Sequence, residues 1–111
     1  MSVKLLLLKS GEDVVSDVQE MVVNEKVVGY YLRYPCRVKL VTNMDGVSEG
    51  QQKVGTRIQL QPWMPLSKES IVSVVADWVV TITEPVDQLV QMYEDGVNKY
   101  EIEQSEAASA E

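Results

Sequence analysis

Valine is the residue that most constrains the fold of this chain. The 111 residues include 20 Val, against nine Leu and four Ile. Because β-branched side chains lose rotamer freedom in helices and pack well on a pleated sheet, this bias predicts a chain rich in strands. Apolar residues make up 45% of the chain and charged residues 24%, which is typical of a single globular domain of this length.

Turn residues divide the valine-rich sequence into short segments of alternating character. We expect strands at 3–9, 13–23, 26–41, 57–61 and 71–83, the last split at Ala76–Asp77, with a polar hairpin loop at 42–56. Gly29 and Pro35 interrupt the long third strand, which predicts bends at both and an edge position for Pro35.

The C-terminal segment has the pattern of one amphipathic helix. Pro85 stands at a favoured first-turn position, and apolar residues recur at helical spacing from Val86 to Tyr100. We therefore expect a mainly β protein: a small, strongly bent five-stranded barrel over residues 1–83, a helix over 84–102 and an acidic flexible tail over 103–111. The core of such a barrel is small, so oligomerisation is a plausible second source of apolar burial.

The charge of the chain is concentrated in this C-terminal segment. Residues 1–83 carry nine basic and nine acidic side chains, whereas residues 84–111 carry eight acidic and one basic, which accounts for the whole net charge of −7. An acidic total usually argues against a nucleic-acid partner. A neutral body can nevertheless carry a basic face.

The composition excludes several kinds of chemistry. The chain has no His and a single Cys, Cys36, which rules out Ser-His-Asp triads, His metal sites, multi-Cys zinc sites and an intrachain disulfide. Residues 43–49 lack the spaced acids of a calcium loop and are better explained by a hairpin turn. We expect no catalytic residue, no metal and no cofactor. The apolar run Leu5–Leu8 is far too short to span a bilayer, so no membrane partner is expected either.

Basic and aromatic residues alternate in the third predicted strand. Arg33, Arg37 and Lys39 share a parity, so they would point to one face of an unbroken strand, although Pro35 lies between them. Tyrosines stand between these cations, and such a mixture can hold phosphates and stack bases. The alternative is a solvated strand face with tyrosines at a barrel rim or a subunit interface. For Trp63 and Trp78 we favour a place in the core or at an interface.

Two segments resemble the motifs of a known family. Residues 9–18 (Lys-Ser-Gly-Glu-Asp-Val-Val-Ser-Asp-Val) resemble the start of the first Sm motif, and residues 74–80 (Val-Val-Ala-Asp-Trp-Val-Val) resemble the second, in which two strands meet at a tight polar turn. On these segments the chain resembles the Sm/LSm family of small SH3-like barrels and, more narrowly, short proteins of marine cyanophages.

The resemblance implies a non-catalytic homo-oligomeric ring. In the family, the fourth strand of one subunit pairs with the fifth strand of the next, which here implies edges at 57–61 and 78–83 and a ring of about five to seven subunits. The implied interface residues are Ile58, Leu60, Trp78, Val80 and Ile82.

The resemblance also implies binding of single-stranded RNA, although the polar positions that grip a base depart from the family pattern. They fall on Val22, Lys26 and Val75–Ala76, with Asn24 the nearest substitute. We expect a phage-encoded ring that binds single-stranded RNA, or DNA, in the cytoplasm of a bacterial host. The residues expected to contact the nucleic acid are Asn24, Lys26, Tyr30, Arg33, Arg37 and Lys39. The alternative is a phage structural or protein-interaction module, with a phage or host protein as partner, that uses the same barrel as a scaffold.

Overall fold

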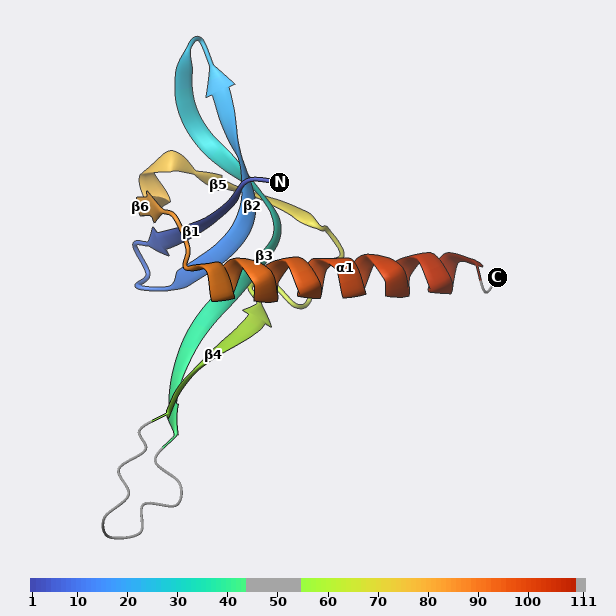
Figure 1. The fold of residues 1–111 in the computed structure, drawn as a ribbon. Helices are drawn as coiled ribbons and strands as arrows, with labels where there is room; N and C mark the ends of the chain where they lie inside the picture. Colours follow the sequence, from blue (N-terminus) through green and yellow to red (C-terminus); the bar gives the residue numbers. More distant parts are fainter. Residues whose placement is uncertain (44–54, 110–111) are drawn as a thin grey trace, which may run out of the picture.

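A computed structural model describes residues 1–43 and 55–109 of the chain. Those residues form six strands, a single 3₁₀ turn and a long C-terminal helix (Figure 1). The elements are β1 (Val3–Leu8), β2 (Asp13–Val23), β3 (Lys26–Asn43), β4 (Gly55–Pro62), β5 (Ile71–Val75), η1 (Ala76–Trp78), β6 (Val79–Thr83) and α1 (Asp87–Ser109).

All strand pairs are antiparallel, and β3 is the centre of the sheet. One edge of β3 pairs with β2, and the other edge pairs first with β5 and then with β4. The sheet order is β4-β3-β2-β1-β6, with β5 paired to β3 beside this path. The prediction of a mainly β, bent, small barrel-like sheet with a C-terminal helix is confirmed. The predicted break at Ala76–Asp77 is the turn η1.

β3 contains extra residues relative to β2 at two points. Asp17 pairs with Arg33 and Val15 with Cys36, so three steps along β3 face two steps along β2. Tyr34, inside this bulge, has a φ of 49°. The predicted edge position of Pro35 is wrong, because β3 is a central strand and Pro35 is buried. The bulge explains how a proline fits there, since a bulged residue does not need to donate to the ladder.

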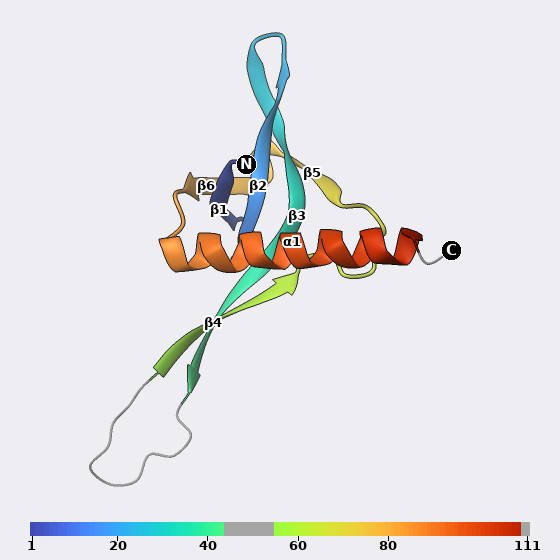
Figure 2. The ribbon, with the colours of Figure 1, turned by 45° about the vertical axis from the view of Figure 1, so that its right-hand side comes forward.

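Two arms leave the body in opposite directions (Figures 1 and 2). One arm is the β2–β3 hairpin, whose turn residues Asn24 and Glu25 have φ values of 52° and 64°, as a tight primed turn requires. The other arm is the outer half of β3 with β4, which we call the β3–β4 ribbon (residues 36–43 and 55–62).

Two clusters of buried side chains hold the fold together, one on each face of the sheet. The first lies under α1 and contains Val3, Val15, Leu89, Tyr93 and Val97. The second contains Leu6, Leu8, Val14 and Leu32, with Trp63 and Ile82 packed against it. The helix therefore covers one face of the sheet, and the barrel closes over the other.

The helix is longer than predicted. It begins at Asp87, after Pro85, and ends at Ser109 rather than at residue 102. The sequence beyond residue 102 is rich in Glu and Ala, which have high helix propensity. The acidic segment expected to be a flexible tail is thus a continuation of α1 as far as residue 109.

Candidate nucleic-acid interface

The bulge at Tyr34 decides which side chains share a face of β3. Residues directly opposite one another in an antiparallel pair lie on the same face. Arg33 and Cys36 therefore share the face of Asp17 and Val15, whereas Arg37, opposite Val14, lies on the other. Arg33 does not share a face with Arg37 and Lys39, because the extra residue reverses the alternation between them.

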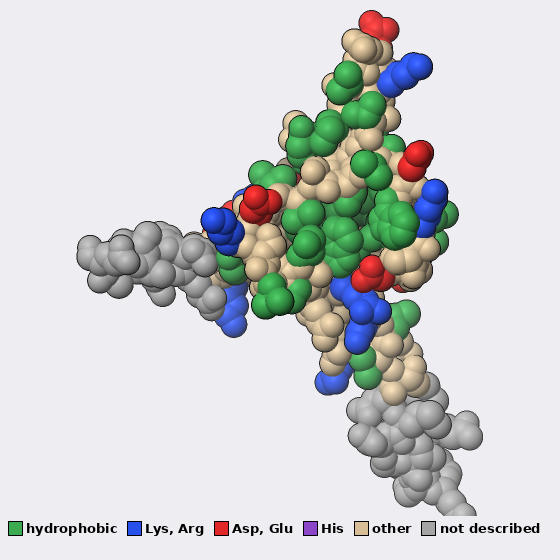
Figure 3. Space-filling view, turned by 180° about the vertical axis from the view of Figure 1, so that it is seen from behind, with side chains coloured by type: hydrophobic (Ala, Val, Ile, Leu, Met, Phe, Trp, Pro, Cys, Tyr) green, Lys and Arg blue, Asp and Glu red, His purple; other side chains and the backbone are tan. Residues whose placement is uncertain are grey.

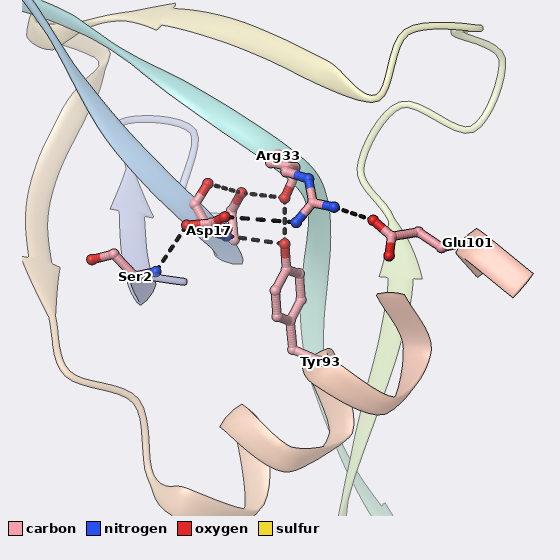
Figure 4. Close-up of polar contacts among 6 residues, drawn as sticks. Ser2, Asp17, Arg33, Tyr93 and Glu101 are labelled. Carbon is pink, nitrogen blue, oxygen red and sulfur yellow. Dashed lines mark hydrogen bonds and ion pairs between the residues drawn. The ribbon is translucent and has the colours of Figure 1, made fainter. Parts of the chain in front are cut away.

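Arg33 lies on the face covered by α1, and its charge is already paired. Its guanidinium forms an ion pair with Glu101 of α1 and lies 3.8 Å from Asp17 Oδ2 (Figure 4). It also lies 5.1 Å from the ring centroid of Tyr34. These contacts tie the helix to the sheet. They leave Arg33 a poor candidate for holding a phosphate.

Tyr93 of α1 completes the hydrogen bonding at the bulge (Figure 4). Its hydroxyl accepts a hydrogen bond from the Asp17 N–H at 3.0 Å and donates one to the Arg33 carbonyl. The buried Ser16 hydroxyl donates to the same carbonyl at 2.9 Å. Burial raises the pKa of Tyr93 to about 12, so the phenol stays neutral and remains a donor at ordinary pH.

A basic face lies on the side of the β3–β4 ribbon turned away from α1. Arg37 pairs with Gln61, Lys39 with Gln59 and Val41 with Arg57, so all six side chains share one face. The opposite face carries Cys36, Val38, Ile58 and Leu60, which pack toward the helix. Figure 3, seen from the side opposite to Figure 1, shows Lys and Arg side chains gathered on this arm below the apolar centre of the molecule.

No acidic residue stands in the described ribbon, residues 36–43 and 55–62. The acidic group recorded near its cations is Glu12 of the β1–β2 turn, whose Oε2 lies 3.8 Å from Arg37 Nε. Arg37, Lys39 and Arg57 are all exposed. Three cations, interleaved with two glutamines, thus point into solvent from one face. We call Arg37, Lys39 and Arg57 the ribbon cations.

Arg57 is the member of this face that sequence reasoning missed. The alternation of Arg57, Ile58, Gln59, Leu60 and Gln61 already indicated a strand with one wet face. The pairing of that strand with β3 was the missing information, since it places Arg57 beside Lys39 rather than near the body.

The other predicted contact residues lie elsewhere. Asn24 and Lys26 are at the tip of the β2–β3 hairpin, and Lys26 is 11 residues from Arg37 along β3, about 36 Å in an extended strand. Tyr30 packs against the second core cluster. The six predicted residues therefore occupy four separate regions: Asn24 and Lys26 share the hairpin tip, Arg37 and Lys39 share the ribbon, and Tyr30 and Arg33 each lie apart from both pairs.

The predicted interface residues also divide into two groups. Ile58 and Leu60 are partly buried against the cluster under α1, and Ile82 is partly buried against the other cluster. Trp78 and Val80 are exposed. In the described chain β5 pairs with β3 alone and β6 with β1 alone, so each presents one free edge.

A groove of about 770 Å³ lies between α1, β4 and the segment that leads to β5. Its walls are mostly apolar and include Leu60, Met64, Met92, Val97 and Tyr100. Gly96 lies in the wall, and no atom lies within 4 Å of the place where a Cβ on it would stand. Cys36 also faces the groove, where burial raises the pKa of its thiol and so disfavours the reactive thiolate.

One comparison with known proteins identifies the fold. The Sm-like domain family matches residues 3–94, which covers the sheet and the first third of α1. No curated protein matches the chain. Among the described residues, no helix is long and apolar enough to cross a membrane. Sm-like proteins are generally non-catalytic, and many form rings that bind RNA. The match extends over most of the chain, and the protein belongs to the Sm-like family.

Proposed function

We propose that the protein assembles into a homo-oligomeric ring that binds single-stranded RNA, or DNA, without catalysing a reaction. The observation that carries this proposal is the basic face of the β3–β4 ribbon, which has no acidic residue of its own and one carboxylate, that of Glu12, beside it, on a chain of the Sm-like family. The acidic helix lies on the opposite face of the sheet, so it does not cover the ribbon cations. A phage origin, and a place in the cytoplasm of an infected bacterium, rest on the resemblance in sequence.

Assembly through β5 and β6 fits the surface of the protomer. Both strands have one free edge, and exposed apolar side chains flank them: Ile71 and Val75 on β5, and Val80 on β6. Pairing β5 of one copy with β6 of the next would satisfy the free backbone groups and bury these side chains. We therefore place the subunit edge at residues 71–75 rather than at 57–61.

Assembly predicts a large effect of a charge on β6. Val80 is 58% exposed, so Val80→Lys should leave the protomer folded and reduce the ring to monomers, because a lysine would be desolvated between paired edges. The matched control is Val86→Lys, which introduces the same charge at a side chain 65% exposed outside the sheet. Light scattering after gel filtration measures the mass. A monomeric wild type, or a ring unaffected by Val80→Lys, would contradict the assembly.

The proposed nucleic-acid binding predicts that loss of the ribbon cations weakens binding, whereas loss of a cation elsewhere does not. The triple variant Arg37→Ala, Lys39→Ala, Arg57→Ala should weaken binding of labelled oligo-U by about tenfold or more. It should also weaken the salt dependence of binding. The slope of log binding constant against log salt concentration should fall in magnitude by about 0.7 for each phosphate that the variant no longer neutralises. The control variant Lys26→Ala removes one cation from the other arm and should change neither quantity, whereas Lys39→Ala removes one cation from the ribbon and should lower both. Anisotropy across a salt series measures both quantities, and equal weakening in the triple variant and the control would refute the assignment.

The groove favours a second candidate, a protein-interaction module. Its apolar walls contain two methionines, which suit an adaptable peptide-binding surface. Gly96→Trp should fill the groove, whereas Gly96→Ala should leave it open. Panning a random-peptide library on the three proteins tests the module. Enrichment of apolar peptides on wild type and Gly96→Ala, but not on Gly96→Trp, supports a peptide-binding groove. No enrichment on any of them argues against it.

A further inference from the structure

The side chains available on the ribbon face indicate which part of a nucleic acid it contacts. The face carries Arg37, Lys39, Arg57, Val41 and two glutamines, and residues 36–43 and 55–62 contain no aromatic residue. Cations and amides contact phosphate oxygens, and grooves that hold single strands through their bases add aromatic side chains on which successive bases stack. The ribbon therefore lacks a platform on which bases could stack.

The aromatic side chains of the described body lie away from the ribbon face. Tyr93 is buried under α1, Tyr34 packs edge-on against Tyr100 at 5.1 Å, and Trp63 packs in the second core cluster. Tyr31 and Trp78 are exposed. Tyr31 lies in the half of β3 that pairs with β5, and Trp78 lies in η1, so both are outside the ribbon. Trp63 follows the ribbon two residues after Gln61, on the side of Arg37, but it packs against the second core cluster, and the ribbon itself contains no aromatic residue.

We infer that the ligand of the ribbon face is the phosphodiester backbone itself, so that RNA and DNA, single-stranded or duplex, all bind there. This inference rests on the proposed function and widens its ligand class. A two-stranded ribbon also fits the major groove of B-form DNA, about 12 Å wide, which gives a duplex access to all three ribbon cations. Binding is then governed by charge and ionic strength and carries little sequence information.

The test uses the full-length protein and four labelled probes of equal length: oligo-U, oligo-A, oligo-dT and a mixed-sequence DNA duplex. The three single strands should bind within about threefold of one another, and the duplex at least as tightly with a steeper salt slope, because a duplex has the higher charge density. The triple alanine variant should weaken all four alike. Glu12→Gln should tighten all four, because it removes the carboxylate beside Arg37.

The outcomes separate the inference from the proposed function. A preference of about tenfold or more for one single strand, or exclusion of the duplex, overturns the inference and leaves the proposed function standing. Absence of binding to every probe at low salt overturns both. Tighter binding in Glu12→Gln is a gain that a misfolded variant cannot produce, so a neutral or weakened Glu12→Gln counts against the ribbon face even if the triple variant no longer binds.

Discussion

Replacing Tyr93 with Phe should destabilise the protein by about 2 kcal/mol, which lowers the melting temperature by roughly 10 °C in a domain of this size. The ring of Tyr93 is 1% exposed, and its hydroxyl satisfies the Asp17 N–H and the Arg33 carbonyl at the bulge. Removing the hydroxyl leaves the partly buried Asp17 N–H without this acceptor. Thermal and urea unfolding followed by circular dichroism measure the decrease in stability.

Two further variants show whether this cost arises at the bulge. Tyr93→Ala should cost about 4 kcal/mol, because it also removes the ring from the cluster under α1. Tyr100→Phe makes the same chemical change as Tyr93→Phe at an exposed side chain, so it should cost less than about 0.5 kcal/mol. Equal stability of Tyr93→Phe and wild type would show that the hydroxyl does not hold the bulge.

The pKa of Tyr93 gives a readout of the burial of the same hydroxyl. A tyrosine in the unfolded chain ionises near pH 10, whereas in the folded protein burial raises the pKa of Tyr93 to about 12. Between these values the unfolded state loses a proton that the folded state keeps. The stability from this group is therefore complete below pH 10 and decreases by up to about 1.4 kcal/mol per pH unit as the pH rises toward 12. Tyr93→Phe lacks the ionisable hydroxyl, so this decrease should be absent from the variant, and the stability difference between wild type and variant should shrink as the pH rises above 10.

Replacing Gly29 with Ala should destabilise the protein by about 2 kcal/mol or more and prevent the proposed assembly of the ring. A Cβ on Gly29 would lie 2.5 Å from the Val74 carbonyl oxygen and 3.6 Å from Val75 Cα, all backbone atoms of β5. Because backbone cannot rotate away as a side chain can, β5 must move off β3. The free edge proposed for assembly moves with it.

Gly96→Ala is the matched control for Gly29→Ala. No atom lies within 4 Å of the place for its Cβ, and Gly96 is inside a helix, so Ala should stabilise the protein by up to about 1 kcal/mol. The same substitution therefore has opposite signs at the two glycines. Unfolding curves measure the stability of both variants, and light scattering measures their mass. A Gly29→Ala protein with wild-type stability and mass would show that β3 and β5 do not pair closely.

The strands could be predicted from local pattern, whereas the faces of β3 could not. Alternation and turn residues located β2 at 13–23 and the break at Ala76–Asp77, because both depend on neighbouring residues. The grouping of Arg33 with Arg37 failed because one bulge residue, Tyr34, reverses the alternation, and parity carries no sign of it. Pro35 is the sequence feature that indicates the bulge, since a proline inside a central strand is found mainly at bulges.

Contacts between distant segments account for the other differences between the predicted site and the site in the structure. Arg33 looked like a free cation until Glu101, 68 residues later, paired with it. Arg57 belongs to a different predicted strand from Lys39, and its pairing with Val41 places the two cations side by side. Both results depend on tertiary pairing, which the sequence pattern of a single strand does not contain. The hairpin turn predicted at 43–49, in preference to a calcium loop, falls almost wholly outside the described residues.

Hydrogen–deuterium exchange with and without oligo-U tests the central claim, that the β3–β4 ribbon is the nucleic-acid interface. The claim predicts slower exchange of backbone amides in residues 36–43 and 55–62 when oligo-U is added, with no change at the tip of the β2–β3 hairpin or at η1. Protection at residues 22–28 and 75–78, with the ribbon unchanged, would contradict it and return the binding site to the positions implied by the Sm motifs.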